Sequence, residues 1–238
     1  MKKLILTIFQ TPKFSKNLFI TVFLTIITFC IGIVTHETGH AITGKVFAYK
    51  NIKLSYKSTF MESKYHDSLK SIRKLRKYEI KNHLNYPEKQ YYREIFEIPT
   101  IYIYASACVL TFLIGFVSLL LLYFNPHLLH FQHWFSYFIF YPSLFLGQFI
   151  SDGIVLLITT ILDKPITMDL IVVASLLYLP RLSLVLFMFI LSTVMLCYLF
   201  FKLMPVEKRA YLILGICLGT IIGRILWFGF LGQILLPA

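Results

Sequence analysis

The chain has 238 residues, of which 58% are hydrophobic and 14% charged, whereas a soluble domain of this length carries about a quarter charged residues. Long runs without charge take up most of the length and leave no room for a separate water-soluble catalytic domain. The formal net charge of +12 does not indicate nucleic-acid binding, because the basic residues gather beside apolar runs, where they set topology or meet anionic lipid headgroups. The sequence therefore predicts an integral membrane protein that contacts the lipid bilayer and no nucleic acid.

Five apolar runs are long enough to cross a hydrocarbon core of about 30 Å as helices. A sixth, shorter run at 166–179 ends before Pro180, and counting it as a span brings the basic residues at 202–209 to the same side as the basic loop. For that reason the sequence favours six spans over five, and the predicted fold class is an all-α, polytopic membrane bundle of five or six helices. The five longer runs are 17–44, 98–124, 131–162, 181–203 and 211–236.

The segment 45–97 is the longest polar stretch and holds thirteen basic and six acidic residues. This basic excess favours a cytoplasmic loop, with the N-terminus outside. Apolar and polar residues alternate over 46–60, which predicts a short pair of strands at the membrane surface. The pattern turns helical and strongly basic over 68–84, which predicts an interfacial amphipathic helix.

An HExxH pattern, His36-Glu37-Thr38-Gly39-His40, lies near the end of the first apolar run. Positions i and i+4 share one face of a helix, so both imidazoles can bind one zinc ion while Glu37 acts on the attacking water. Three ionisable groups inside a membrane span are costly unless they are paired or bound to a metal. The pattern therefore predicts a zinc site with Glu37 as its catalytic residue.

A catalytic zinc needs a third protein ligand. Asp152 is the candidate that lies deep inside another apolar run, about 16 Å from the polar end of its span, against about 14 Å for His36. Alternatively, Asp152 lines a polar cavity or pairs with Arg224. Another alternative places the third ligand in the loop. The other candidates are His66 and His83 in the loop, and His127, His130 and His133, which we expect at the opposite membrane surface.

This constellation resembles the site-2 protease family of intramembrane zinc metalloproteases, on the residues His36-Glu37-Thr38-Gly39-His40-Ala41 and Asp152-Gly153. The resemblance implies that His36, His40 and Asp152 bind Zn²⁺, that Glu37 is the general base, and that the alternating segment holds substrate. It covers a three-span core at 17–162, including the loop 45–97, with additional C-terminal helices at 163–238. In the family a proline shortly precedes Leu-Asp-Gly, whereas here Ser151 precedes Asp152 and Pro142 lies ten positions upstream.

Four further features of the sequence are weaker signals. Gln148, one turn before Asp152, is a possible ligand of the substrate backbone, or else a helix-to-helix hydrogen-bond donor. Gly215, Gly219 and Gly223 form a smooth helix face that favours packing inside the chain over dimerisation. Arg224 follows that face and pairs with Glu207 or Asp169, or lines a hydrated inlet. The four cysteines, Cys30, Cys108, Cys197 and Cys217, show no paired spacing and are expected in the core, with no disulfide or metal role.

The sequence as a whole favours a zinc-dependent intramembrane endopeptidase whose partner is a membrane protein or peptide precursor. Two alternatives stay open: a noncatalytic membrane protein, either a proton-coupled transporter or a peptide-binding degenerate homologue, and a zincin with His66 or His83 as third ligand. The expected location is multi-pass in a membrane, and we favour the bacterial plasma membrane because the chain is compact and shows no organelle-targeting pattern.

Overall fold

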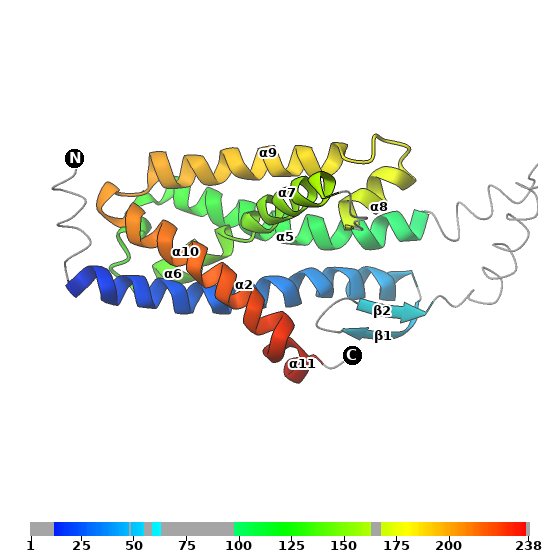
Figure 1. Ribbon diagram of the computed structural model, residues 1–238, viewed down its shortest axis with the longest axis horizontal. Helices are drawn as coiled ribbons and strands as arrows, with labels where there is room; N and C mark the ends of the chain where they lie inside the picture. The colour runs from blue at the N-terminus through cyan, green and yellow to red at the C-terminus, as the bar shows by residue number, and fades with distance from the viewer. Residues whose placement is uncertain (1–11, 48, 55–58, 63–97, 163–167, 237–238) are drawn as a thin grey trace, which may run out of the picture.

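The computed structural model describes residues 12–47, 49–54, 59–62, 98–162 and 168–236. These residues form long helices and one small sheet (Figure 1). The predicted amphipathic helix at 68–84, with His66 and His83, lies outside the described residues. The elements in chain order are α2 (Pro12–Val46), β1 (Lys50–Leu54), β2 (Thr59–Glu62), α5 (Ile98–Phe124), η2 (Pro126–His130), α6 (Trp134–Ser143), α7 (Leu146–Ile161), α8 (Asp169–Leu176), α9 (Ser183–Tyr198), η3 (Leu199–Leu203), α10 (Val206–Leu226), η4 (Trp227–Leu231) and α11 (Gly232–Leu235).

Within the described ranges, five helices are long and apolar enough to cross a membrane, which confirms the predicted helical membrane bundle. Their bounds are Ser15–Val46, Ile98–Phe124, Trp134–Ile161, Ser183–Leu203 and Val206–Leu235. The preference for six spans is wrong, because α8 has only eight residues and is about 12 Å long. With five crossings, the turn before α10 lies at the end of the bundle opposite the basic loop. There the Lys208 ammonium donates to the main-chain oxygens of Leu129 and His130 at η2.

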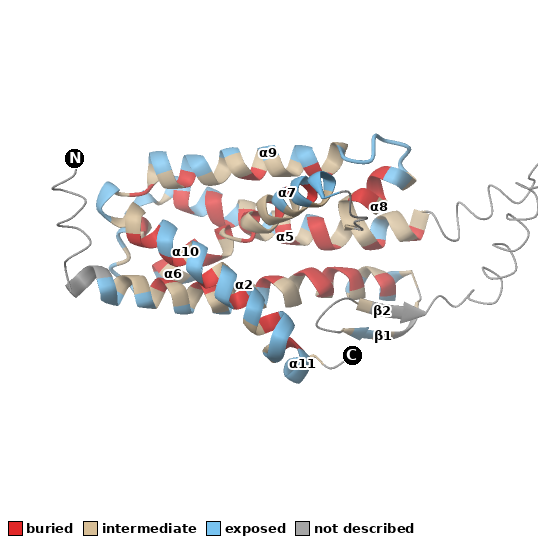
Figure 2. Ribbon diagram, in the orientation of Figure 1, coloured by how far each residue is buried: buried red, intermediate tan, exposed pale blue. Residues whose placement is uncertain are grey.

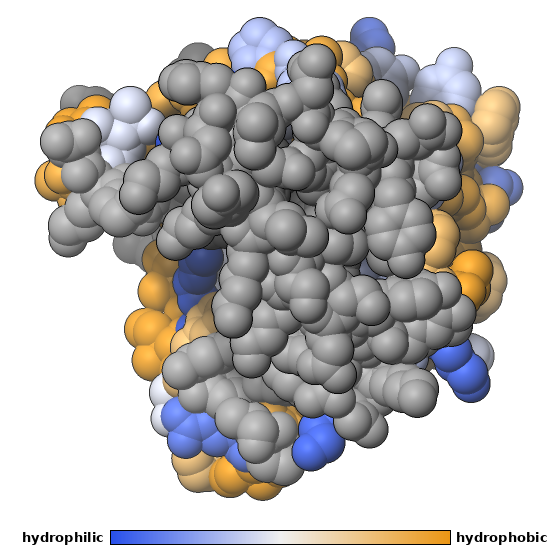
Figure 3. All heavy atoms as spheres, turned by 90° about the vertical axis from the view of Figure 1, so that its right-hand side faces the viewer, coloured by the Kyte–Doolittle hydropathy of each residue, from blue (hydrophilic) through white to orange (hydrophobic). Residues whose placement is uncertain are grey.

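The outward faces of the spans are apolar and open, as a helix surface in lipid requires. Phe187, Ile190 and Ile225 are 61%, 59% and 67% exposed, whereas buried residues line the faces between helices (Figure 2). Seen from the end of the bundle that carries β1, β2 and α8, hydrophobic side chains cover both flanks (Figure 3). Exposed apolar surface of this extent is typical of contact with lipid rather than water.

Glycines allow α10 to pack directly against α2, along the contact that crosses the front of Figure 1. A Cβ atom added at Gly215 would lie 2.6 Å from Thr21, and one at Gly219 would lie 2.6 Å from Thr25. A Cβ at Gly223 would lie 3.2 Å from the Phe29 ring. The glycine face therefore serves packing inside the chain, as the sequence favoured.

The third span is broken between α6 and α7. Pro142 lies inside the last turn of α6 and cannot donate a main-chain hydrogen bond, so the helix ends at Ser143 and restarts at Leu146. The break changes the direction of the helix axis between α6 and α7. It places Gln148, on the first turn of α7, beside α2. Gly153 on α7 then allows close contact with Phe189 of α9.

Strands β1 and β2 pair antiparallel, with Lys53 opposite Phe60 and Leu54 opposite Thr59, and this confirms the predicted strand pair. Figure 1 shows the sheet beside the C-terminal end of α2, at the end of the bundle where the basic loop begins. The alternation over 46–60 was therefore a correct signal for a small sheet that packs on the HExxH helix.

Candidate metal centre

Helix α2 carries His36 and His40 on the surface that it buries against α5, and Glu37 on the side next to the sheet. The three side chains are nearly inaccessible, with residue exposures of 9%, 8% and 7%. The two imidazole rings are one helical turn apart, with centroids 5.1 Å apart and planes at 90°. Close approach of α5 is possible because Gly39 has no side chain: a Cβ there would lie 2.7 Å from the Cα of Ala107.

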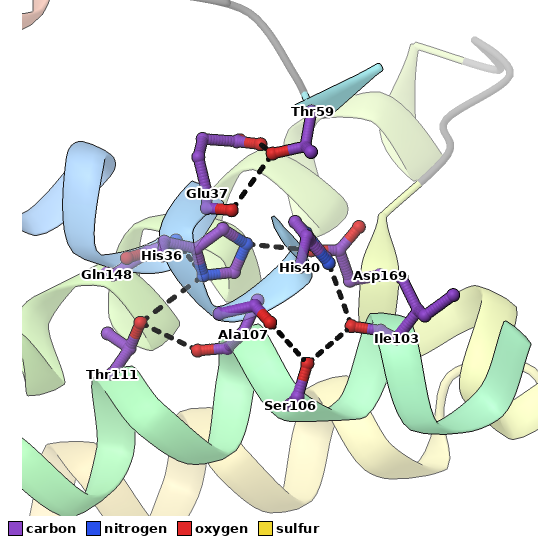
Figure 4. A network of polar contacts seen from close by, with 11 residues as sticks. His36, Glu37, His40, Thr59, Ile103, Ser106, Ala107, Thr111, Gln148 and Asp169 are labelled. Carbon is purple, nitrogen blue, oxygen red and sulfur yellow. Dashed lines mark hydrogen bonds and ion pairs between the residues drawn. The ribbon is translucent and has the colours of Figure 1, made fainter. Parts of the chain in front are cut away.

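Asp169, the first residue of α8, completes this cluster from a distant part of the chain. One carboxylate oxygen, Oδ2, lies 2.7 Å from Nε2 of His36 and 3.1 Å from Nε2 of His40 (Figure 4). Met168 before it is extended, so that the chain turns into α8 with the Asp169 side chain directed at α2. The structure thus brings together two imidazoles and one carboxylate, which is the donor set of a three-residue zinc site.

The ring nitrogens that face away from Asp169 are held by α5. Nδ1 of His40 lies 2.8 Å from the main-chain oxygen of Ile103, and Nδ1 of His36 lies 3.3 Å from the Thr111 hydroxyl. That hydroxyl donates its own proton to the main-chain oxygen of Ala107, so it accepts one from His36. These contacts favour the tautomer with a proton on Nδ1, in which Nε2 is the atom that binds a metal; at 2.7 and 3.1 Å the two Nε2 atoms lie within hydrogen-bond or ion-pair distance of the carboxylate.

The protonation states of these groups bear on whether they can bind a metal. Burial disfavours charge on Asp169, but its contacts with His36 and His40 outweigh burial and hold the pKa of the carboxyl group below its usual range. An ionised carboxylate and two free Nε2 atoms are the states in which these groups bind metal. Ligand atoms of a tetrahedral zinc at about 2.0–2.1 Å stand about 3.3 Å apart, and the two Nε2–Oδ2 distances of 2.7 and 3.1 Å lie within about 0.6 Å of that spacing, so this donor set fits zinc by its chemistry and by those two distances.

Asp152, the third ligand expected from the sequence, does not belong to this cluster. Among the described residues, two sets of potential ligand atoms lie within 4.8 Å of one another: His36 with Glu37 and His40, and His36 with Cys108 and Asp169. Asp152 instead lines the cavity that His36 also faces, on α7. This position agrees with the alternative stated for Asp152, a carboxylate that lines a polar cavity.

Sequence reasoning missed Asp169 because the residue lies in a short run that was treated as a membrane span. A signal was present: Pro165 comes four positions before Asp169 and Met168 directly before it. In the site-2 protease pattern a proline shortly precedes the aspartate. The four positions between Pro165 and Asp169 match that pattern better than the ten positions between Pro142 and Asp152. Cys108 is buried as expected and has its thiol beside His36 and Asp169, whereas the prediction of a core position is wrong for Cys197 and Cys217, which are exposed on the outer faces of their spans.

Glu37 projects toward the sheet rather than toward Asp169. The Thr59 hydroxyl on β2 lies 2.8 Å from Oε2 of Glu37 and 2.9 Å from its main-chain oxygen (Figure 4). The hairpin thus orients the carboxylate that the sequence predicts as the general base. On the other side of the cluster, the Gln148 amide nitrogen lies 3.4 Å from Nδ1 of His36, which is a contact between α7 and α2 of the kind considered as the alternative for Gln148. Binding of the substrate backbone by Gln148 stays a prediction.

A cavity of about 380 Å³ opens beside the cluster between α2, α7, α8, α9 and α10. Its wall carries Glu37, Gln148, Asp152 and Arg224, and is otherwise largely apolar. Arg224 donates to the Ser151 hydroxyl at 3.1 Å, so of the roles considered for it the structure supports the one of lining the cavity. No protein-family model, curated protein or solved structure matches this chain.

Proposed function

We propose that the protein is a zinc-dependent intramembrane endopeptidase, with His36, His40 and Asp169 as the metal ligands. The observation that carries this proposal is that Nε2 of His36 and Nε2 of His40 both contact one carboxylate oxygen of Asp169, while Glu37 lies beside the two histidines on α2. The chemistry that zinc supplies in such sites is Lewis acidity, which activates water and polarises a scissile carbonyl. The bacterial plasma membrane stays a prediction.

Glu37 is suited to move protons in this reaction. Its Oε2 accepts the hydroxyl of Thr59, which leaves Oε1 to take a proton from the attacking water. The same oxygen then passes the proton to the leaving amine. Burial of the carboxylate keeps bulk water away from it, so the proton stays in the site between the two steps.

The surroundings of the metal centre suit a substrate segment whose helix has locally unwound. A membrane helix hides its carbonyl groups in its own hydrogen bonds, so a substrate has to unwind locally before it can be cut. The β1–β2 sheet packs beside Glu37 and offers strand pairing to such a segment. These features favour a membrane protein or peptide precursor as substrate.

Metal analysis of the purified protein in detergent tests the ligand set. We expect one zinc per chain in the wild type and in the matched control Asp152→Ala, and loss of zinc in Asp169→Ala. The opposite pattern, with zinc retained in Asp169→Ala and lost in Asp152→Ala, would return the third ligand to Asp152.

Cleavage is tested with a synthetic peptide that carries an apolar segment of leucine and alanine, two central glycines, lysines at both ends and a quenched fluorophore. We expect the wild type to cut it in the apolar segment, and Glu37→Gln to bind zinc normally without cutting. Cleavage that persists in Glu37→Gln contradicts the role of Glu37, and a wild type that binds zinc but cuts no such peptide favours a noncatalytic protein.

A further inference from the structure

The α7 and α10 side of the cavity carries a second polar cluster that the metal centre does not use. Ser151 and Asp152 follow Gln148 by three and four residues, so the three share one face of α7. All three line the cavity, as does Arg224 on α10. The hydrogen bond from Arg224 to Ser151 joins the two helices there.

The Asp152 carboxylate is the open acceptor of this cluster. It lies within electrostatic range of His36, Asp169 and Arg224, yet none of the described residues donates a hydrogen bond to it. The Arg224 guanidinium has five N–H donors, of which the structure uses one on Ser151. The half-buried acceptor Asp152 and the exposed donors of Arg224 therefore line the same cavity of a membrane protein, where polar groups without partners are costly.

The pairing of opposite charges indicates what kind of group fits. A side chain with a single charge complements either Asp152 or Arg224 and is repelled by the other. A peptide group is uncharged and offers one N–H and one carbonyl oxygen, which match the carboxylate and the guanidinium together. The apolar remainder of the cavity, including Phe29, Ile33 and Phe200, accommodates the side chains of an apolar segment.

We propose that Asp152 and Arg224 form a main-chain binding subsite for the unwound part of an apolar substrate helix. The inference rests on the proposed function, because it assumes that a peptide enters the cavity. Asp152 accepts a hydrogen bond from an N–H of that peptide, and Arg224 donates one to a carbonyl oxygen. These bonds pair main-chain groups that unwinding would otherwise leave without a hydrogen-bond partner in the hydrocarbon. The substrate is then held on both sides of the metal centre, by the β1–β2 sheet and by this subsite.

Binding is measured in the Glu37→Gln background, which separates it from cleavage. The probe is the leucine, alanine and glycine peptide described above, with a donor dye at one end in place of the quenched pair, in nanodiscs of phosphatidylcholine and phosphatidylglycerol. Energy transfer to an acceptor on the exposed Cys197, in a Cys217→Ala background, reports the Kd. Asp152→Leu and Arg224→Met are each expected to weaken binding about tenfold, the loss of one hydrogen bond to a charged group.

Two controls separate main-chain binding from a structural role. Arg209→Met makes the same replacement in α10 about 22 Å away along the helix and should leave the Kd unchanged. A probe with N-methylated central glycines lacks the N–H groups, so it should bind about tenfold more weakly to the parent protein. Asp152→Leu should weaken that methylated probe no further, because the two changes remove the same hydrogen bond.

The inference is overturned if the losses of affinity from N-methylation and from Asp152→Leu multiply when the methylated probe is measured with the Asp152→Leu protein. It is also overturned if Arg224→Met binds the probe as tightly as the parent protein does. A central lysine or glutamate that tightens binding would instead indicate recognition of a charged side chain. Loss of zinc in Asp152→Leu would identify Asp152 as a metal ligand and would also overturn the inference. Failure of the proposed function shows separately, as a wild type that does not cut the peptide.

Discussion

Gly39→Ala tests whether the close contact between α2 and α5 supports the metal centre. A Cβ at this position would lie 2.7 Å from the Cα of Ala107 and 3.0 Å from its main-chain nitrogen. Carbon atoms in contact stand about 3.5–4.0 Å apart, so the two helices must separate by about 1 Å. Both atoms in the way belong to the backbone, so rotation of a side chain cannot relieve the clash.

The magnitude follows from that displacement. A separation of about 1 Å lengthens the 2.8 Å contact between Nδ1 of His40 and the Ile103 oxygen to about 3.8 Å, beyond hydrogen-bond range. Loss of such a supporting contact typically lowers metal affinity about 10-fold to 100-fold. Overpacking adds about 1–3 kcal/mol of destabilisation.

The assays are zinc affinity by competition with a chelator, and thermal unfolding followed by the fluorescence of the buried Trp227. Gly229→Ala is the matched control, because no atom lies within 4 Å of a Cβ at that position. A Gly39→Ala protein with unchanged zinc affinity and unchanged unfolding temperature would refute the reasoning, since the helices would then have room that the structure does not give them.

Three further substitutions probe the contacts around the site. Thr59→Val removes the hydroxyl that orients Glu37, so peptide cleavage should fall about tenfold with zinc retained; faster cleavage would mean that the hairpin inhibits the enzyme. Thr111→Val removes the hydroxyl that Nδ1 of His36 contacts and should weaken zinc binding about 10-fold to 100-fold in a chelator competition; an unchanged affinity would show that this contact does not support the metal centre. Gly219→Val should lower stability by about 1–3 kcal/mol without changing the oligomeric state in detergent, and dissociation of an oligomer would assign the glycine face to dimerisation.

The long helices were predictable because the bilayer restricts what a chain can do inside it. Residues 98–124 were expected as a span and form α5 with the same bounds, since every main-chain group in hydrocarbon has to be bonded within its own helix. The spacing of His36 and His40 likewise follows from helix geometry alone. The strand pair was also readable, because alternation over 46–60 marks a sheet with one face packed and one face open.

The contact of Asp169 with the two imidazoles was not predictable in the same way. Asp152 was favoured because it lies at the depth of His36, and depth along a helix places both residues beside one cavity. Depth does not say which way a side chain points or what a short segment between two spans does. Asp169 reaches the imidazoles because α8 is too short to cross the membrane and folds back against α5.

Local pattern in the sequence thus determined the membrane class, the five long spans, the HExxH face and the small sheet, because each depends on neighbours a few residues apart. The tertiary structure alone decided the contacts that join distant segments: Asp169 with two imidazoles about 130 positions away, Thr59 with Glu37, and Arg224 with Ser151. Such contacts depend on how the helices pack, and packing depends on steric fit at positions such as Gly39 and Pro142, which hydropathy does not encode.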